Sequence, residues 1–586
     1  MLSKTEIRIL DLLPTLDSNE DKDLIRCQTR VIPFPTDIQY ETVSYVWGAV
    51  DDTEYVEVDG IYIPITANLV AALKHIRLSN NIRTLWIDQL CINQHDEKEK
   101  ANQVALMGQI YSTTSRCLIW LGEISEDVSL SNAQLSLEFI RLISNIELKQ
   151  EGIWELNIAT EFASEQALRG LMQALESIGS RSNAWWARMW TLQEAVLPPK
   201  ACVLWGGLSM EWEVIVSAAF NWRDMPFDPI VDTYHEALSP IFSQVLGLIF
   251  TKEERDPFDT AFRWSFRKAS NPLDKVYGLM GLFPAGSLPR VQACDYGLPR
   301  ATLYAMFTAD LIEHNRSLHP IALRCLQNLP ESTPDIPRWA LDMGVSDRQY
   351  AVTVDGNDYA WYLTNTYDCY EACGMTTINW NRFRYNQIFN ALELTGCMID
   401  TVAVAGSRPQ YDKTNTCDVT CAGAAQMIQD WYQMADKFYQ SQAHRNPILG
   451  TSPWPDSFWR GLLGNITLNP EYFFKGLATS EDVELAKKFA QTGHRNDICD
   501  SIFANLVHRK MIITRTGLLG FVPHHANVGD QIWILHGGKT PFVLRPTEGT
   551  SQLGDEYVFI GSCYIHGIME GEAMEPEKIS TDVVLK

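Results

Sequence analysis

The chain has 586 residues, more than one hydrophobic core usually serves, so its length predicts two to four domains. Hydrophobic residues make up 46% of the chain and charged residues 20%, the balance of an ordinary globular protein. The formal net charge of −24 argues against an extended nucleic-acid surface and against docking on an anionic membrane.

The cysteines and the apolar segments point to one cellular setting. The 13 Cys are scattered without a disulfide framework, which is typical of free thiols in a reducing compartment. The first residues lack the apolar stretch of a secretory signal, and no run of about 18 apolar residues predicts a membrane span. We therefore expect a cytoplasmic protein with no membrane span.

The N-terminal segment predicts alternating strands and helices. Three strands are expected, at residues 40–48, 84–90 and 117–121. A hairpin and a short helix separate the first two strands, and a helix that begins at Asn93 or Asp96 and ends near Thr113 joins the second to the third. This order implies a parallel sheet, and parallel sheets bind ligands beyond the carboxyl ends of their strands. Those ends lie at Trp47-Gly48, Asp88–Asn93 and Gly122.

A helical insertion at about 123–184 then separates the third strand from a Trp-rich stretch, WWARMWTLQEAV at 185–196. The stretch predicts one helix, which must stop before the two prolines that follow. Such a helix places Trp190 and Glu194 four residues apart on one face. Taken alone, an aromatic stripe usually marks packing, and we expect Trp185 and Trp186 to pack. Another strand follows the prolines.

The whole sequence predicts four regions. They are an α/β domain at 1–207, a helical region at 208–345, a mixed α/β region at 346–505 and a β-rich domain at 506–586. The HGGKT segment at 536–540 resembles part of a phosphate loop. It lacks the upstream Gly, and a proline and a strand follow it, so we expect a hairpin turn.

The sequence offers little for a metal or a resident cofactor. The 12 His follow no metal-ligand spacing, and no GxGxxG follows a strand. Two CxxxC pairs, Cys369/Cys373 and Cys417/Cys421, would hold zinc only if they met in space, and two unrelated structural pairs are the favoured interpretation. We therefore expect neither a metal nor a cofactor.

Three segments together resemble a known family. They are YETVSYVWG at 40–48, the stretch from LWIDQLCINQ to CLIWLGE at 85–123, and RMWTLQEAVLPPKACVLWG at 188–206. In this order they resemble the fungal heterokaryon incompatibility (HET) domain. NPLDKVYGLMGL at 271–282 resembles a segment that commonly follows in these proteins, and the β-rich tail resembles their usual C-terminal region.

The HET resemblance implies a TIR-like, that is flavodoxin-like, N-terminal domain with a role in cell-death and immune signalling. Many TIR domains cleave NAD⁺ at the nicotinamide–ribose bond with a catalytic Glu, which in several of them lies in a W-x-x-x-E pattern. Trp190 and Glu194 fit that pattern. The resemblance therefore implies Glu194 as the catalytic carboxylate and NAD⁺ as a substrate.

The resemblance also implies residues that would bind the substrate around this Glu. Trp190 or Trp47 would stack on a ring of the substrate. Ser44, Tyr45 and Gly48 belong to the end of the first strand and its loop, where phosphates would be held. Asp88, Asn93 and Arg188 would fix a loop, a ribose or a phosphate, and for these three a structural role is the favoured interpretation.

Three alternatives for the function stay open at this stage. The first is an NAD⁺-cleaving effector that triggers death in incompatible or infected cells. The second is a non-enzymatic signalling module that acts by self-association, and a relative with no role in cell death is a third alternative. We expect a homo-oligomer on activation, with a protein as one kind of trigger. The sequence specifies neither the trigger nor the product of NAD⁺ cleavage.

Overall fold

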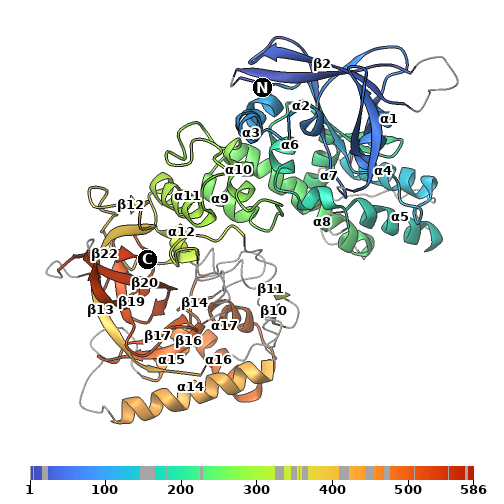
Figure 1. Ribbon diagram of the computed structural model, residues 1–586. Coiled ribbons are helices and arrows are strands. Elements are labelled where there is room, and N and C mark those ends of the chain that lie inside the picture. Colours follow the sequence, from blue (N-terminus) through green and yellow to red (C-terminus); the bar gives the residue numbers. More distant parts are fainter. Residues whose placement is uncertain are drawn as a thin grey trace. The chain divides into compact units, whose positions relative to one another are not determined.

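The computed structural model forms two compact units (Figure 1). Unit 1 consists of Met1–Gly286 and Gln292–Gly297, and unit 2 of Ser287–Val291 and Leu298–Lys586. None of the helices in the described part of the chain has both the length and the apolar character needed to cross a membrane. The structure describes residues 2–3, 5–15, 24–49, 51–145, 165–179, 182–224, 229–323, 335–344, 353–354, 357–358, 367–407, 421–441, 454–467, 476–506, 509–551, 554–574 and 579–586.

A mixed sheet is the framework of unit 1, with its strands in the order β5-β4-β2-β1-β6-β3-β7-β8-β9. The last strand continues the sheet past the predicted boundary at 207, and the division into four regions stays a prediction. The strands are Glu6–Leu12 (β1), Arg26–Pro33 (β2), Glu41–Ser44 (β3), Thr53–Val58 (β4), Ile61–Thr66 (β5), Arg83–Trp86 (β6), Cys117–Trp120 (β7), Ala201–Trp205 (β8) and Leu208–Glu211 (β9).

Four of these strands form a parallel core. β3 pairs in parallel with β6 on one side and with β7 on the other, and β7 pairs in parallel with β8. By chain order the core runs second, first, third, fourth, as at the start of a flavodoxin-like sheet. The predicted parallel sheet is confirmed for this core only, because β1 and β9 flank it in antiparallel pairs. Ligand sites of such sheets lie where the strand order reverses, here beyond the carboxyl ends of β3 and β7.

Glu41 lies at the amino end of β3, the end opposite the expected ligand site, and links β3 to both neighbouring strands. Its carboxylate accepts hydrogen bonds from the Nε of Arg83 on β6 at 2.5 Å and from the Nε of Arg116, just before β7, at 3.0 Å. Burial by itself raises the pKa of Glu41, but the two guanidinium groups hold this pKa below its usual value. The paired charge therefore fixes β3 between β6 and β7.

The first long helix after the second predicted strand begins at Asp96. Its carboxylate accepts hydrogen bonds from the main-chain N–H groups of Lys98 and Glu99, which leaves Asn93 outside the helix. The described helices of unit 1 are Ala67–Ile76 (α1), Asp88–Cys91 (α2), Glu97–Thr113 (α3), Leu130–Ser144 (α4), Glu165–Ile178 (α5), the 3-10 helix Ala184–Ala187 (η2), Thr191–Val196 (α6), Trp212–Asp224 (α7), Pro229–Glu254 (α8), Pro257–Arg263 (α9) and Asp274–Met280 (α10).

The prediction of a single helix at residues 185–196 is wrong. The chain forms η2 and then α6, with extended backbone at Arg188 between them (φ −80°, ψ 139°). Arg188 bridges in parallel to Lys268, whose carbonyl accepts a hydrogen bond from the Met189 N–H at 2.9 Å. A distant segment thus takes a hydrogen bond that a continuous helix would have made internally. Trp190 precedes α6, so it still lies about one turn before Glu194.

Unit 2 is built on one long strand, β13 (Ala391–Ala405), which lies in the region predicted only as mixed α/β. It pairs with β22 and then β18 along its first part and with β16 along its last part. Because β18, β19, β20 and β22 also pair in that order, these strands close into a ring with β13. The predicted β-rich C-terminal part is confirmed. β18 and β19 pair antiparallel on either side of the HGGKT segment, which is therefore the predicted hairpin turn.

Helices of unit 2 pack against β16 and β17. Buried side chains such as Trp431, Phe458, Phe489 and Phe521 lie between them. The described helices are Arg300–Asn315 (α11), His319–Leu323 (α12), the 3-10 helix Tyr367–Cys369 (η5), Cys421–Ser441 (α14), Asp456–Leu462 (α15), Ser480–Thr492 (α16) and Cys499–Leu506 (α17). The other strands are Thr353–Val354 (β10), Asn357–Asp358 (β11), Arg384–Asn386 (β12), Ile466–Thr467 (β14), Gly476–Leu477 (β15), Arg509–Thr514 (β16), Leu519–Pro523 (β17), Gln531–Leu535 (β18), Phe542–Ser551 (β19), Gly554–Ser562 (β20), Tyr564–Ile565 (β21) and Thr581–Leu585 (β22).

Candidate functional site

A buried carboxylate lies at the carboxyl end of the central strand of unit 1. Glu194 on α6 is 3% exposed, and its Oε2 accepts a hydrogen bond from the Ser44 hydroxyl at 2.5 Å. Ser44 is the last residue of β3 and is fully buried. Its hydroxyl oxygen in turn accepts a hydrogen bond from the Trp185 indole N–H at 2.8 Å. This chain of hydrogen bonds directs the hydroxyl proton of Ser44 at Glu194, next to the point where the strand order reverses.

Burial dominates the ionisation of Glu194. It raises the pKa of this carboxyl group to about 7, while the charge of Arg188 and the hydrogen bond from Ser44 lower the pKa and the charge of Asp88 raises it. Within the described part of the chain, no cationic side chain forms an ion pair with Glu194. Near neutral pH the group therefore populates both protonation states, a property of carboxyl groups that take part in binding or catalysis.

Arg188 lies beside this carboxylate and is anchored by the main chain of the first strand's loop. Its guanidinium group donates a hydrogen bond to the Tyr45 carbonyl. Tyr45 is 2% exposed, and its hydroxyl donates to the Gln89 side chain at 3.3 Å. Arg188 itself is half-buried and has more N–H donors than this one bond uses. Tyr45 thus supports Arg188 through its backbone, and Arg188 is the nearest candidate partner for an anionic ligand.

The loop after β3 is held by α1 and α2. The Trp47 indole N–H donates a hydrogen bond to Asp88 Oδ2 at 2.8 Å, and both side chains are half-buried. The Asn68 amide donates to the Val46 carbonyl at 2.6 Å. Gly48 is exposed and has φ +82°, a backbone conformation that favours glycine. These contacts give Asp88 a supporting role for Trp47, and they fix the loop on which a ligand would rest.

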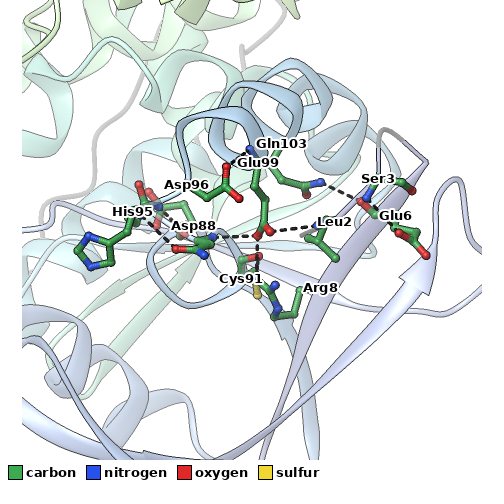
Figure 2. A network of polar contacts seen from close by, with 12 residues as sticks. Leu2, Ser3, Glu6, Arg8, Asp88, Cys91, His95, Asp96, Glu99 and Gln103 are labelled. Atoms are coloured by element: carbon green, nitrogen blue, oxygen red, sulfur yellow. Dashed lines mark hydrogen bonds and ion pairs between the residues drawn. The ribbon is translucent and has the colours of Figure 1, made fainter.

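Asn93 contributes its main-chain N–H to a polar network around Glu99. Figure 2 shows this network. Glu99 is fully buried and accepts hydrogen bonds from the N–H groups of Leu2 at 3.0 Å and Asn93 at 3.1 Å and from the Arg8 guanidinium at 3.2 Å. The Asn93 side chain accepts a hydrogen bond from the His95 N–H at 3.1 Å. Asn93 therefore shapes this loop, and the structure gives it no contact with Glu194.

Trp190 interacts with a carboxyl group that sequence reasoning missed. Asp274 begins α10, accepts a hydrogen bond from the Tyr296 hydroxyl at 2.8 Å and interacts with the Trp190 side chain. Burial raises the pKa of Asp274, whereas these two contacts and nearby cations lower it. The NPLDKVYGLMGL segment at 271–282 contains Asp274 and was the one signal in the sequence that could have found it.

Two predicted roles change. Trp186 packs as expected, with its indole N–H on the Ile178 carbonyl at 2.8 Å. Trp185 does more than pack, because it donates to Ser44. Ser44 was expected to hold a phosphate, but it is fully buried and bonded to Trp185 and Glu194, so in this structure it supports the carboxylate instead. The site thus gathers Glu194, Ser44, Tyr45 and Arg188, with Trp47 on the adjoining loop and Asp88 at the start of α2.

No group of three or more His, Cys, Asp or Glu side chains that could hold a metal ion occurs among the residues that the structure describes. Cys417 lies outside these residues, so the zinc alternative stays untested. The buried Cys91, which follows Asp88 in α2, has its pKa raised to about 12 by burial, so its thiol is not a reactive nucleophile.

Comparisons with known proteins identify the family. The heterokaryon incompatibility protein (HET) family matches residues 40–194, and the Het-6 beta-barrel domain family matches residues 475–582. The chain therefore contains a HET domain. The heterokaryon incompatibility protein 6 (OR allele) of Neurospora crassa is 23% identical to it, over 97% of this chain and 94% of that protein. No solved structure matches the chain, so the TIR-like nature of the HET domain stays a prediction.

The extent of the HET match bears on the site. The match ends at Glu194, and it includes every residue that the sequence analysis places in the site. Asp274 and Tyr296 lie beyond it, although they belong to the same compact unit. The site of this HET protein therefore draws on a segment outside the family match.

Proposed function

We propose that this HET protein acts in heterokaryon incompatibility as a cell-death effector whose first unit cleaves NAD⁺ at the nicotinamide–ribose bond. The observation that carries the proposal is the buried Glu194 carboxylate, which accepts a hydrogen bond from the Ser44 hydroxyl. It lies where the strand order reverses in the parallel core of the sheet. A carboxylate that is shielded from water stabilises developing positive charge more strongly than an exposed one does.

The reaction requires one group of this kind. The bond between ribose C1′ and the nicotinamide nitrogen breaks, and its electron pair leaves with nicotinamide, which departs neutral and needs no general acid. Positive charge develops on the ribose, and the ionised Glu194 stabilises it, as a carboxylate does in glycoside hydrolysis. Water then adds at C1′ and loses a proton to solvent, which gives ADP-ribose. Another nucleophile in place of water would give a cyclised or base-exchanged product.

The electrostatics of the site support a cationic substrate. Burial leaves Glu194 with a pKa of about 7, and a positively charged pyridinium ring beside it would favour the ionised form. Arg188 would meet a phosphate, and the half-buried indoles of Trp47 and Trp190 would contact a ring. Because Glu194 is only 3% exposed, the proposal requires that activation uncover the carboxylate. Self-association is the step to which we assign this change.

The test is expression of the full chain in yeast cells, with NAD⁺ content and viability followed together. The parent chain is expected to deplete NAD⁺ before the cells die. Glu194→Gln should abolish both effects at equal protein level. Glu97→Gln, at an exposed position in the first turn of α3, is the matched control and should act as the parent does. Equal NAD⁺ loss with Glu194→Gln would overturn the proposal.

The alternative is a signalling module that acts by self-association without catalysis. It predicts that cells die while NAD⁺ stays constant and that Glu194→Gln remains toxic. That combination would replace the enzymatic proposal by the signalling one, because toxicity would then not depend on the buried carboxylate.

A further inference from the structure

Residues 264–281, which we call the clamp, hold the segment that carries Glu194. The clamp lies in unit 1 and beyond the HET match. Its Lys268 pairs with the extended backbone before α6: the Lys268 N–H donates to the Ala187 carbonyl at 2.5 Å, and the Lys268 carbonyl accepts from the Met189 N–H at 2.9 Å. The end of η2 is thereby tied to the clamp by main-chain hydrogen bonds on both sides of Arg188.

A second part of the clamp, on α10, packs closely against α6. The Gln193 amide donates hydrogen bonds to the carbonyls of Tyr277 at 3.3 Å and Gly278 at 2.9 Å on α10. A Cβ at Gly281 would lie 2.4 Å from Gln193 Oε1, and a Cβ at Gly278 would lie 2.6 Å from Met189 Cγ. α6 also contacts α3, α8 and α10, and Figure 1 shows it among these helices. The position of Glu194 is therefore set by the clamp as well as by β3.

The third contact of the clamp is a fully buried arginine. Arg267 Nη1 donates hydrogen bonds to the Arg188 carbonyl at 3.1 Å and to the Thr191 hydroxyl at 2.6 Å. Its Nη2 donates to the Gln244 side chain at 3.3 Å, and its guanidinium carbon lies 4.6 Å from the centre of the Trp264 ring. All of these partners are neutral, so the hydrogen bonds position the group without neutralising its charge.

A buried cation without a carboxylate partner is costly. Burial lowers the pKa of Arg267 to about 9, and the charge of Glu194 is what opposes this change. The effect is mutual, since the charge of Arg267 lowers the pKa of Glu194. The hydrogen bonds of Arg267 reach Arg188, which precedes α6, and Thr191, the first residue of α6. Its charge and its contacts therefore act on the same carboxylate.

We propose that Arg267 is a positioning residue for Glu194: it holds the turn from Arg188 to Thr191 in place and supplies the buried positive charge that favours the ionised carboxylate. Its consequence for catalysis rests on the proposed NAD⁺ cleavage, whereas its effect on the ionisation of Glu194 does not. The functional unit of this HET protein then extends past residue 194, where the family match ends, to the clamp.

The other charged and titratable groups that interact with Glu194 determine the pH range in which its ionisation can be measured. Arg188 and Asp88 are charged, and Tyr45 on the β3 loop, Tyr111 on α3 and Cys117 on β7 also interact with it electrostatically. Burial raises the pKa values of these two tyrosines and of Cys117, so all three stay neutral between pH 5 and pH 8. Glu194 can therefore be followed in this range against a constant background from these three groups.

The experiment measures the ionisation of Glu194 in the full chain without using turnover. Melting temperatures are recorded from about pH 5 to pH 8. The parent is compared with Glu194→Gln, and Arg267→Lys and Arg267→Gln are each compared with the double variant that also carries Glu194→Gln. The difference within each pair changes with pH as Glu194 ionises. Arg267→Lys keeps the positive charge, and Arg267→Gln keeps hydrogen-bond donors but removes the charge.

The pH at which the slope of this difference falls to half, which we call the ionisation midpoint of Glu194, should be near pH 7 for the parent and for Arg267→Lys. It should be higher for Arg267→Gln by roughly half a pH unit, less than the 1–3 units of a direct charge contact. Arg267→Met is a second neutral variant for the case that Arg267→Gln does not fold, because buried charges are often replaced by apolar side chains of similar volume. Equal midpoints for the parent and the folded neutral variants would overturn the proposal, as would an equal shift in Arg267→Lys.

Nicotinamide release from NAD⁺ by the same variants separates this proposal from the proposed function. If release occurs, its pH midpoint should move with that of the melting data and be rescued by Arg267→Lys. If no variant releases nicotinamide while the melting midpoints shift as expected, NAD⁺ cleavage fails and the role of Arg267 stands. Release whose pH midpoint is the same in the parent and in the neutral variants would contradict the role of Arg267 in catalysis.

Discussion

Unit 1 contains two buried glutamates near the first turns of helices, Glu99 in α3 and Glu194 in α6, and the two differ in how their charge is satisfied. Glu99 accepts hydrogen bonds from two main-chain N–H groups and from Arg8, and these contacts hold its pKa below the usual value although burial opposes them. Glu194 accepts a hydrogen bond from the Ser44 hydroxyl, and burial raises its pKa to about 7. A carboxylate whose charge is satisfied stabilises a fold, whereas one whose charge is left unsatisfied is available to a ligand.

The largest expected effect on stability belongs to Glu99. Glu99→Gln removes the charge opposite Arg8 and places an amide N–H₂ among donors, so the free energy of unfolding at pH 7 should fall by roughly 3 kcal/mol. The pKa of Glu99 is lowered by folding, so its contribution is present above its unfolded-state pKa and is lost as the pH falls through the lowered value. Denaturant unfolding at pH 7 and at about pH 4 measures this, and an undiminished difference at the lower pH would contradict it.

Glu194→Gln should change the free energy of unfolding in the opposite direction. The folded state raises the pKa of this group from 4.5 to about 7, so the folded state binds more protons than the unfolded state between these values and loses stability as the pH rises through them. Removing the charge should therefore stabilise the protein at pH 8, by up to about 3 kcal/mol at roughly 1.4 kcal/mol per pKa unit, and have little effect at pH 4.5. Unfolding of both proteins at the two pH values measures this. Destabilisation at pH 8 would show that Glu194 is a structural group like Glu99.

Ser44→Ala sharpens the comparison by removing the hydroxyl that bonds to Glu194. This hydrogen bond lowers the pKa of the carboxyl group, so its loss should move the ionisation midpoint of Glu194 upward by up to about one pH unit. The midpoint is read from the pH dependence of stability relative to the double variant with Glu194→Gln. Thr42→Val removes another buried hydroxyl from the same strand and should leave the midpoint unchanged. A common shift in both variants would point to a general change of β3.

Asn93→Ala should have the smallest effect. Its side chain is exposed and accepts a hydrogen bond from the His95 N–H, and the main-chain bond to Glu99 persists in the variant. We expect the free energy of unfolding to change by less than about 0.5 kcal/mol and NAD⁺ turnover to stay as in the parent. A tenfold loss of turnover at unchanged stability would make Asn93 a ligand contact after all.

The parts of the fold that the sequence predicts are those with local causes. Strands β7 and β8 are short apolar runs that end at glycines, and Asp96 caps α3 with its own side chain. The break before Trp190 has no such cause. It depends on the main chain of Lys268, which a pattern within 185–196 does not contain.

The same distinction applies to the site. Glu194 and Trp190 lie in one short motif and could be predicted from the family resemblance. Arg267, by contrast, is an ordinary cation in the sequence, and its burial beside α6 follows only from the fold. The role of Ser44 could not be predicted either. A serine at the end of a strand can contact a ligand or support a nearby carboxylate, and the sequence does not distinguish the two roles.

The most direct test of the account is nicotinamide release from NAD⁺ by the purified full chain in its self-associated state as a function of pH, for the parent, Glu194→Gln and Glu97→Gln. Glu194 must be ionised, so release should rise as the pH increases through about 7. Glu194→Gln should be slower by at least about a hundredfold at pH 8, and Glu97→Gln should equal the parent. Release by Glu194→Gln at the parental rate, or no release by the parent at any pH, would contradict the assignment of Glu194 as the catalytic carboxylate.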